Sequence, residues 1–71
     1  SSGVGPGGRL AAMRDLVTRA LKGPLLPAQQ QQVLSELEAD PKLVARLGLL
    51  PRHLPPLVEN APQIATEVLL R

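Results

Sequence analysis

The chain has 71 residues, a formal net charge of +2, and no cysteine, phenylalanine, tyrosine or tryptophan. A chain of this length supports one small domain that buries only about 60% of its unfolded surface, which argues against a large enclosed active site. Without cysteine there are no disulfides or thiolate metal sites, and no apolar run approaches the roughly 20 residues that span a bilayer.

The first eight residues, SSGVGPGG, carry too little apolar surface to become ordered, so residues 1–8 are predicted to be a flexible tail. A helical domain is predicted over residues 9–71. Its first helix covers residues 9–22, where apolar side chains recur every three or four positions and therefore share one helical face. Gly23 followed by Pro24 ends this helix.

The second predicted helix covers residues 27–39 and begins at Pro27, because a first-turn position needs no amide hydrogen. Leu26 precedes it and has no side-chain oxygen to cap the first turn, so residues 27–30 are expected to fray. The four glutamines at residues 29–32 are interpreted as helix formers on an exposed first turn.

A third helix is predicted over residues 41–47, with Asp40 as its N-terminal cap and Gly48 as its C-terminal cap. Residues 50–54 can form only about one further turn, because the residue before Pro55 is pushed out of the helical region. Another short turn is then predicted over residues 55–59.

The last helix is predicted to start after Asn60, which pairs with Gln63 as a capping box. An apolar stripe follows that reaches the end of the chain and consists of Ile64, Ala65, Val68 and Leu69. Since no later helix covers its far side, further helices are expected after Arg71, and the helical domain is expected to be truncated there. The predicted fold is all-α, a small bundle of about five short proline-initiated helices that begins a larger helical-repeat-like domain.

Catalytic chemistry is disfavoured because no set of suitable side chains is present. His53 is the single histidine and has no cysteine or second histidine to join it, so it is interpreted as a solvated or capping residue. Glu36 and Glu38 lie two positions apart, on different sides of a helix, and Asp40 is better explained as a cap. We therefore expect no enzyme, no cofactor and no metal.

Three phrases carry a resemblance to a known family: LSELEADPKLV at residues 34–44, LGL at residues 47–49, and LPPLVENAPQIATEVLL at residues 54–70. Their order and spacing resemble the start of the C-terminal conserved domain of the eleventh subunit of the Ccr-Not deadenylase complex. The likeness covers roughly the last two thirds of the chain.

The resemblance implies a non-catalytic scaffold subunit that docks accessory proteins in mRNA decay, translational repression and gene silencing. Its implied partners are other subunits of the complex, with the tenth subunit bound through regions absent here, and its implied location is the cytoplasm and the nucleus. The small net charge and the lack of aromatic rings argue against direct nucleic acid contact, and the lack of a long apolar run argues against a membrane partner. The candidate interaction and packing residues are Leu54, Leu57, Val58, Glu59, Asn60, Ile64, Val68 and Leu69.

An alternative function is a small basic helical domain that binds nucleic acid. Its candidate phosphate contacts are Arg9, Arg14, Arg19, Lys22 and Arg52. The basic residues of the first helix splay around it instead of forming a stripe, and the chain offers no aromatic ring on which a base could stack. Both points favour the interaction module.

Overall fold

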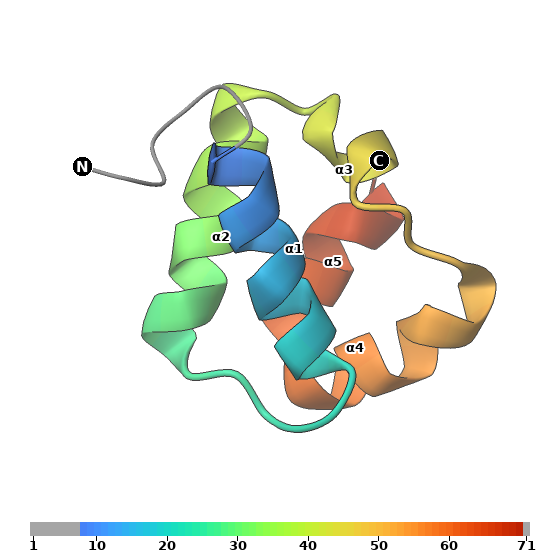
Figure 1. The fold of residues 1–71 in the computed structure, drawn as a ribbon. Coiled ribbons are helices and arrows are strands. Elements are labelled where there is room, and N and C mark those ends of the chain that lie inside the picture. Colours follow the sequence, from blue (N-terminus) through green and yellow to red (C-terminus); the bar gives the residue numbers. More distant parts are fainter. Residues whose placement is uncertain (1–7, 71) are drawn as a thin grey trace.

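The structure is a computed structural model and describes residues 8–70. Within this range the chain forms helices and no strand (Figure 1). In chain order the elements are α1 (Gly8–Ala20), α2 (Pro27–Ala39), α3 (Leu43–Arg46), the 3-10 helix η1 (Pro51–His53), α4 (Leu54–Asn60) and α5 (Pro62–Leu70). The predicted all-α class is confirmed. The predicted tail lies outside the described residues, except for Gly8, which begins α1.

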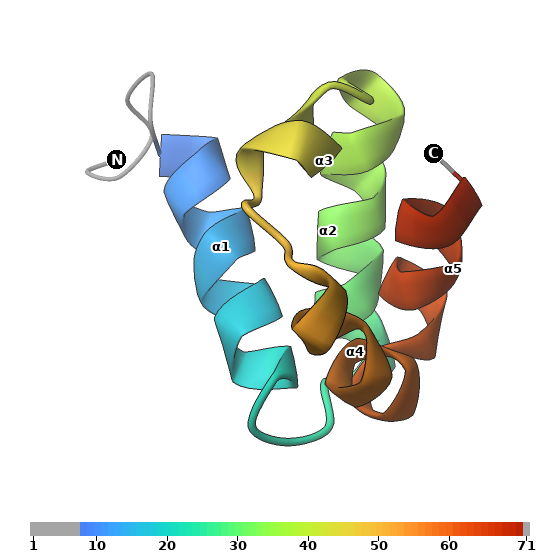
Figure 2. The same cartoon turned by 90° about the vertical axis from the view of Figure 1, so that its right-hand side faces the viewer.

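The core lies where four helices meet. In Figure 2, α2 stands between α1 and α5, and α4 contacts both α1 and α5. The apolar side chains of the core are Met13, Val17, Ala20, Leu25, Val33, Leu37, Leu43, Leu47, Leu57, Ala61, Ile64 and Ala65. No helix of the described part has the length and apolar character to cross a membrane.

The start of α2 differs from the prediction of a fraying, exposed end. The backbone N–H of Leu26 donates to Oε1 of Gln29 at 3.0 Å, so the glutamine side chain ties the chain before the helix to its first turn. Gln30 is only 5% exposed. Its Nε2 donates to the Leu25 carbonyl at 3.3 Å, and its Oε1 accepts from the N–H of Gln63 at 3.0 Å. The interpretation of all four glutamines as solvated helix formers is therefore wrong for Gln30.

The predicted capping box of the last helix is also wrong. Asn60 is the final residue of α4, and its Nδ2 donates across the molecule to the carbonyl of Ala20 at 2.7 Å. The residue between the two helices is Ala61, whose carbonyl accepts the first helical bond of α5 from Ala65 at 2.9 Å. The orphan N–H of Gln63 is satisfied by Gln30 of α2, so a distant side chain replaces the local cap.

The predicted start of α3 is wrong, whereas the glycine after its end is confirmed. Oδ1 of Asp40 accepts from the N–H of Lys42 at 3.2 Å, but α3 begins only at Leu43, and the residue before it is Lys42, so Asp40 is not its N-terminal cap. Gly48 has a φ of +69°. A left-handed residue of this kind turns the chain away from the helix axis, and glycine adopts it without a Cβ penalty.

The two short elements after this turn have different bounds from those predicted. Pro51 begins η1, as expected, but α4 begins at Leu54 and not at Pro55. Pro55 and Pro56 fall in the first turn of α4, where no intrahelical N–H donor is required, so neither breaks the helix. Leu54 therefore joins η1 directly to α4.

Candidate interaction surface

Seven of the eight predicted site residues form three groups in the structure, and Asn60 stands apart from them. Leu57 and Ile64 are fully buried in the core and contribute packing. Val58, which is 51% exposed, and Glu59 lie at the surface of α4. Asn60 is held by its bond to Ala20. A third group, consisting of Leu54, Val68 and Leu69, lines a groove.

This groove has a volume of about 380 Å³ and an apolar lining that four elements supply. Its lining residues are Val44, Ala45, Leu49, Leu50, Pro51, Leu54, Val68 and Leu69. We call it the α3–α5 groove. Leu50 and Leu69 are 42% and 61% exposed, so water reaches large apolar side chains here. In Figure 1, α3 and the chain that follows it lie near the C-terminal end of α5, and both line the groove.

Two sets of hydrogen bonds hold the groove wall that the chain forms after α3. Nε and Nη2 of Arg14 donate to the carbonyl of Arg46 at 3.2 and 2.7 Å, which ties the end of α3 to α1. Farther along, the N–H of Leu50 donates to Nδ1 of His53 at 3.0 Å, and the N–H of His53 donates to the Leu50 carbonyl at 2.9 Å. The structure therefore confirms the interpretation of His53 as a capping residue.

A second, smaller pocket of about 200 Å³ lies between α1 and α2. Its apolar lining comes from Ala12, Met13, Leu16 and Val33. At its rim, Arg9 and Glu36 approach to 3.9 Å, with side chains that are 73% and 32% exposed. An ion pair as exposed as this contributes little to stability, so the pocket rim is held mainly by the packing of the two helices.

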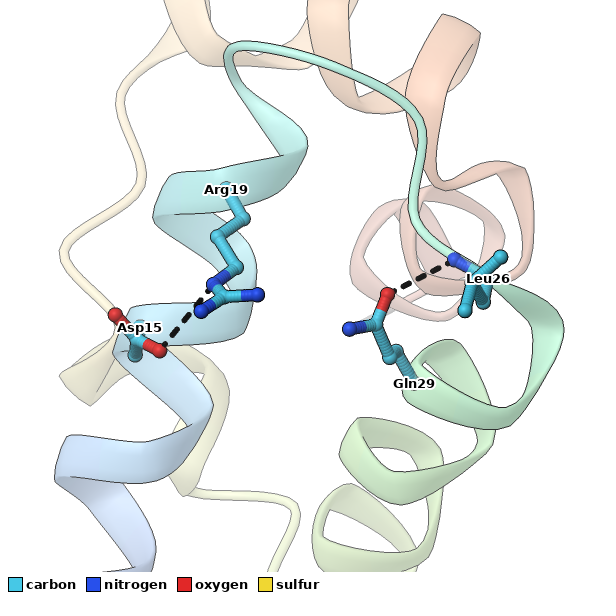
Figure 3. Close-up of polar contacts among 4 residues, drawn as sticks. All are labelled: Asp15, Arg19, Leu26 and Gln29. Carbon is cyan, nitrogen blue, oxygen red and sulfur yellow. Dashed lines mark hydrogen bonds and ion pairs between the residues drawn. The ribbon is translucent and has the colours of Figure 1, made fainter.

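The basic residues of α1 do not form a phosphate-binding track. Arg9 faces Glu36, and Arg14 is committed to the Arg46 carbonyl. Nε of Arg19 lies 3.5 Å from Oδ2 of Asp15 one turn earlier, as Figure 3 shows. Since three of these arginines already face protein oxygens, the geometry offers no support for the nucleic acid alternative.

Within residues 8–70 no group of three or more His, Asp or Glu side chains has the arrangement of a metal site. The acidic side chains of α2 and its C-terminal end instead have structural partners: Glu36 faces Arg9, and Asp40 accepts the N–H of Lys42.

Sequence reasoning identified one side of the α3–α5 groove and missed the other. The missed residues are Val44, Ala45, Leu49, Leu50 and Pro51. The run LGLLP at residues 47–51 could have indicated this side of the groove. It places two leucines directly after a glycine turn, where a change in chain direction can expose apolar side chains.

Comparison with known proteins gives two relationships. The sequence model of the family described as Creb binding matches residues 7–47. A Dictyostelium discoideum protein, CCR4-NOT transcription complex subunit 11, is 48% identical over 59 residues, which are 83% of this chain and 9% of that protein. The chain thus spans about a tenth of the length of this relative. No solved structure matches. The resemblance to the eleventh subunit is confirmed by this identity.

Proposed function

Since the chain belongs to the family described as Creb binding, and since it is similar to a segment of CCR4-NOT transcription complex subunit 11, we propose that it is a non-catalytic interaction module of the CCR4-NOT complex. In this role it docks a protein of the complex, or an accessory protein, during mRNA deadenylation and translational repression. Membership of the complex would place it in the cytoplasm and the nucleus.

The observation that carries this proposal is the α3–α5 groove. Exposed apolar surface is costly in water, and contiguous patches on small domains mark contacts with other molecules. The groove combines large exposed side chains, Leu50 and Leu69, with half-buried ones, Val44, Leu54 and Val68. A partner side chain that enters it would therefore be surrounded by apolar atoms on several sides.

The groove can be changed without disturbing the core, which makes the proposal testable. Leu50→Asp and Leu69→Asp each place a charge on an exposed lining position. Val58→Asp is the matched control, because Val58 is an equally exposed apolar residue on α4 that does not line the groove.

The experiment measures recovery of the tagged 71-residue chain with purified CCR4-NOT complex. We expect recovery to fall about tenfold or more for Leu50→Asp and Leu69→Asp, which corresponds to about 1.4 kcal/mol or more of binding free energy. Val58→Asp should be recovered like the unchanged chain. Equal recovery of all three variants, each with unchanged helicity, would contradict the proposed surface.

A second candidate function comes from the description of the matched family, which is Creb binding. The match covers α1 to α3, and the pocket between α1 and α2 lies wholly inside it. In this case Leu16→Glu, at the lining of that pocket, would abolish recovery of Creb, whereas Leu69→Asp would leave it unchanged. The two variants therefore separate the two candidate surfaces.

A further inference from the structure

The chain uses the same local cap twice. Both α2 and η1 start at a Leu-Pro dipeptide, and in both the N–H of the leucine donates at 3.0 Å to the side chain three residues later. At α2 the acceptor is Oε1 of Gln29, as Figure 3 shows. At η1 the acceptor is Nδ1 of His53. The two leucines also share an extended backbone, with ψ values of 151° and 159°.

The two acceptors differ in one chemical respect. A carboxamide oxygen accepts a hydrogen bond throughout the physiological pH range. Nδ1 of an imidazole accepts only while its lone pair is free, and in the imidazolium form both ring nitrogens are donors. Because the partner is a backbone N–H, which can only donate, the bond from Leu50 to His53 requires the neutral ring with its proton on Nε2.

This cap holds one wall of the α3–α5 groove. Leu50, Pro51 and Leu54 all line the groove, and they surround His53 in sequence. The N–H that His53 accepts belongs to the first of them. Loss of the bond would leave the Leu50 N–H without its acceptor and remove one of the two hydrogen bonds that join Leu50 to His53.

The elements around this cap contain several charged residues. Arg52 precedes His53 in η1, and Glu59 is the charged residue of α4, which packs against η1. Among the helices that form the other walls, α3 contains Arg46 and α5 contains Glu67, and neither residue lines the groove. Neither of the ion pairs described above involves His53.

We propose that His53 is a pH-dependent latch for the α3–α5 groove. The neutral ring binds the Leu50 N–H and holds the groove in its docking shape. A proton taken up from solution at Nδ1 removes this acceptor, and the wall then loosens at Leu50. The latch therefore opens on acidification. The regulatory part of this inference rests on the proposed docking function of the groove.

The latch itself is tested on the free 71-residue chain by nuclear magnetic resonance between pH 8 and pH 5. We expect the Nε2–H tautomer at pH 8, and a Leu50 amide resonance that shifts with the same midpoint as the His53 ring. The Leu26 amide, capped by Gln29, is the internal control and should not follow this titration. An Nδ1–H tautomer at pH 8, or a Leu50 amide that ignores the ring titration, would overturn the latch.

Two variants separate the cap from general effects of pH. His53→Gln reproduces the cap of α2, so the Leu50 amide should stop titrating and keep its high-pH position. His53→Ala has no acceptor, so this amide should hold its low-pH position at every pH. A Leu50 amide that titrates in His53→Gln as in the unchanged chain would contradict the proposal.

Coupling to docking is tested with purified CCR4-NOT complex at pH 8 and pH 6. The unchanged chain should lose recovery at pH 6, and His53→Gln should retain it. If the unchanged chain is recovered equally at both pH values while the Leu50 amide still titrates, the regulatory claim fails. If the complex is not bound at either pH, the proposed function fails, and the free-chain measurement still decides the latch.

Discussion

Gln30 shows how much one buried polar side chain can organise in a core without aromatic residues. Its Nε2 donates to the Leu25 carbonyl, and its Oε1 accepts from the Gln63 N–H. The side chain therefore joins the loop before α2 to the start of α5. It is the buried polar residue among the otherwise apolar core positions of the described chain. Both the nitrogen and the oxygen of the Gln30 amide have hydrogen-bond partners, and a buried polar atom without a partner would lower stability.

Gln30→Ala should lower the free energy of unfolding by about 1 to 3 kcal/mol, because it leaves the Gln63 N–H and the Leu25 carbonyl without their partner. Gln31→Ala is the matched control, since Gln31 is exposed and should change stability by less than about 0.5 kcal/mol. Urea denaturation followed by circular dichroism measures both values. Equal effects of the two changes would show that the bonds of Gln30 contribute nothing.

Gly48 is the residue whose backbone conformation the fold most clearly requires. Its φ of +69° is favourable for glycine and costs other residues about 1 to 2 kcal/mol. A Cβ at this position would meet no atom within 4 Å, so any cost is conformational and not steric. A Cβ at Gly23 would also meet no atom within 4 Å, but Gly23 does not have a positive φ.

Gly48→Ala should therefore destabilise the chain by about 1 to 2 kcal/mol, whereas Gly23→Ala should be neutral or slightly stabilising. Thermal and urea melts of the two variants provide the comparison. A neutral Gly48→Ala would mean that the turn after α3 adopts other conformations at little cost.

At the scale of the elements, the sequence predicted helix starts better than the contacts between helices. Proline positions located the beginnings of α2 and η1, because the proline ring dictates φ locally, but α3 and α4 begin at Leu43 and Leu54 and not at the prolines predicted to start them. The role of Asn60 could not be found in this way, since its partner Ala20 is 40 residues away. Local patterns such as a capping box compete with tertiary partners, and here the tertiary partner prevails.

The same limit applies to the candidate site. The apolar stripe of the last helix was visible in the sequence, and its exposed end does line the α3–α5 groove through Val68 and Leu69. Its other half, Ile64 and Ala65, is buried against the bundle. Periodicity places side chains on one helical face, but it does not reveal which part of that face neighbouring helices cover.

Leu26→Ser tests the cap of α2. Leu26 is 66% exposed, so its replacement removes little buried surface. A serine hydroxyl can accept a first-turn N–H, and we expect stabilisation by about 1 kcal/mol. The measurement is the urea denaturation midpoint. A fall in this midpoint would show that the leucine side chain contributes packing that its exposure does not reveal.

At the scale of the whole molecule, a small aliphatic core makes the stability of the fold depend on a few buried side chains. Four of the largest core side chains, Leu37, Leu57, Ile64 and Val33, are fully buried. They come from α2, α4 and α5, so the loss of one position affects several helix contacts at once. A chain of this size has few other contacts to compensate.

Leu57→Asp should abolish the cooperative fold, because a buried carboxylate without a partner costs several kcal/mol. Val58→Asp, one position away but half exposed, should leave the fold intact. Amide resonance dispersion distinguishes the two outcomes. A well-dispersed spectrum for Leu57→Asp would contradict the described core.

The central claim is that the α3–α5 groove is the docking surface of this module for the CCR4-NOT complex. The most direct test compares methyl resonances of the 71-residue chain with and without the purified complex. The account predicts that the methyl signals of Leu50, Leu54 and Leu69 shift or broaden, and that those of Met13 and Leu16, in the pocket between α1 and α2, do not. Changes confined to Met13 and Leu16, or no change at any methyl group, would contradict it.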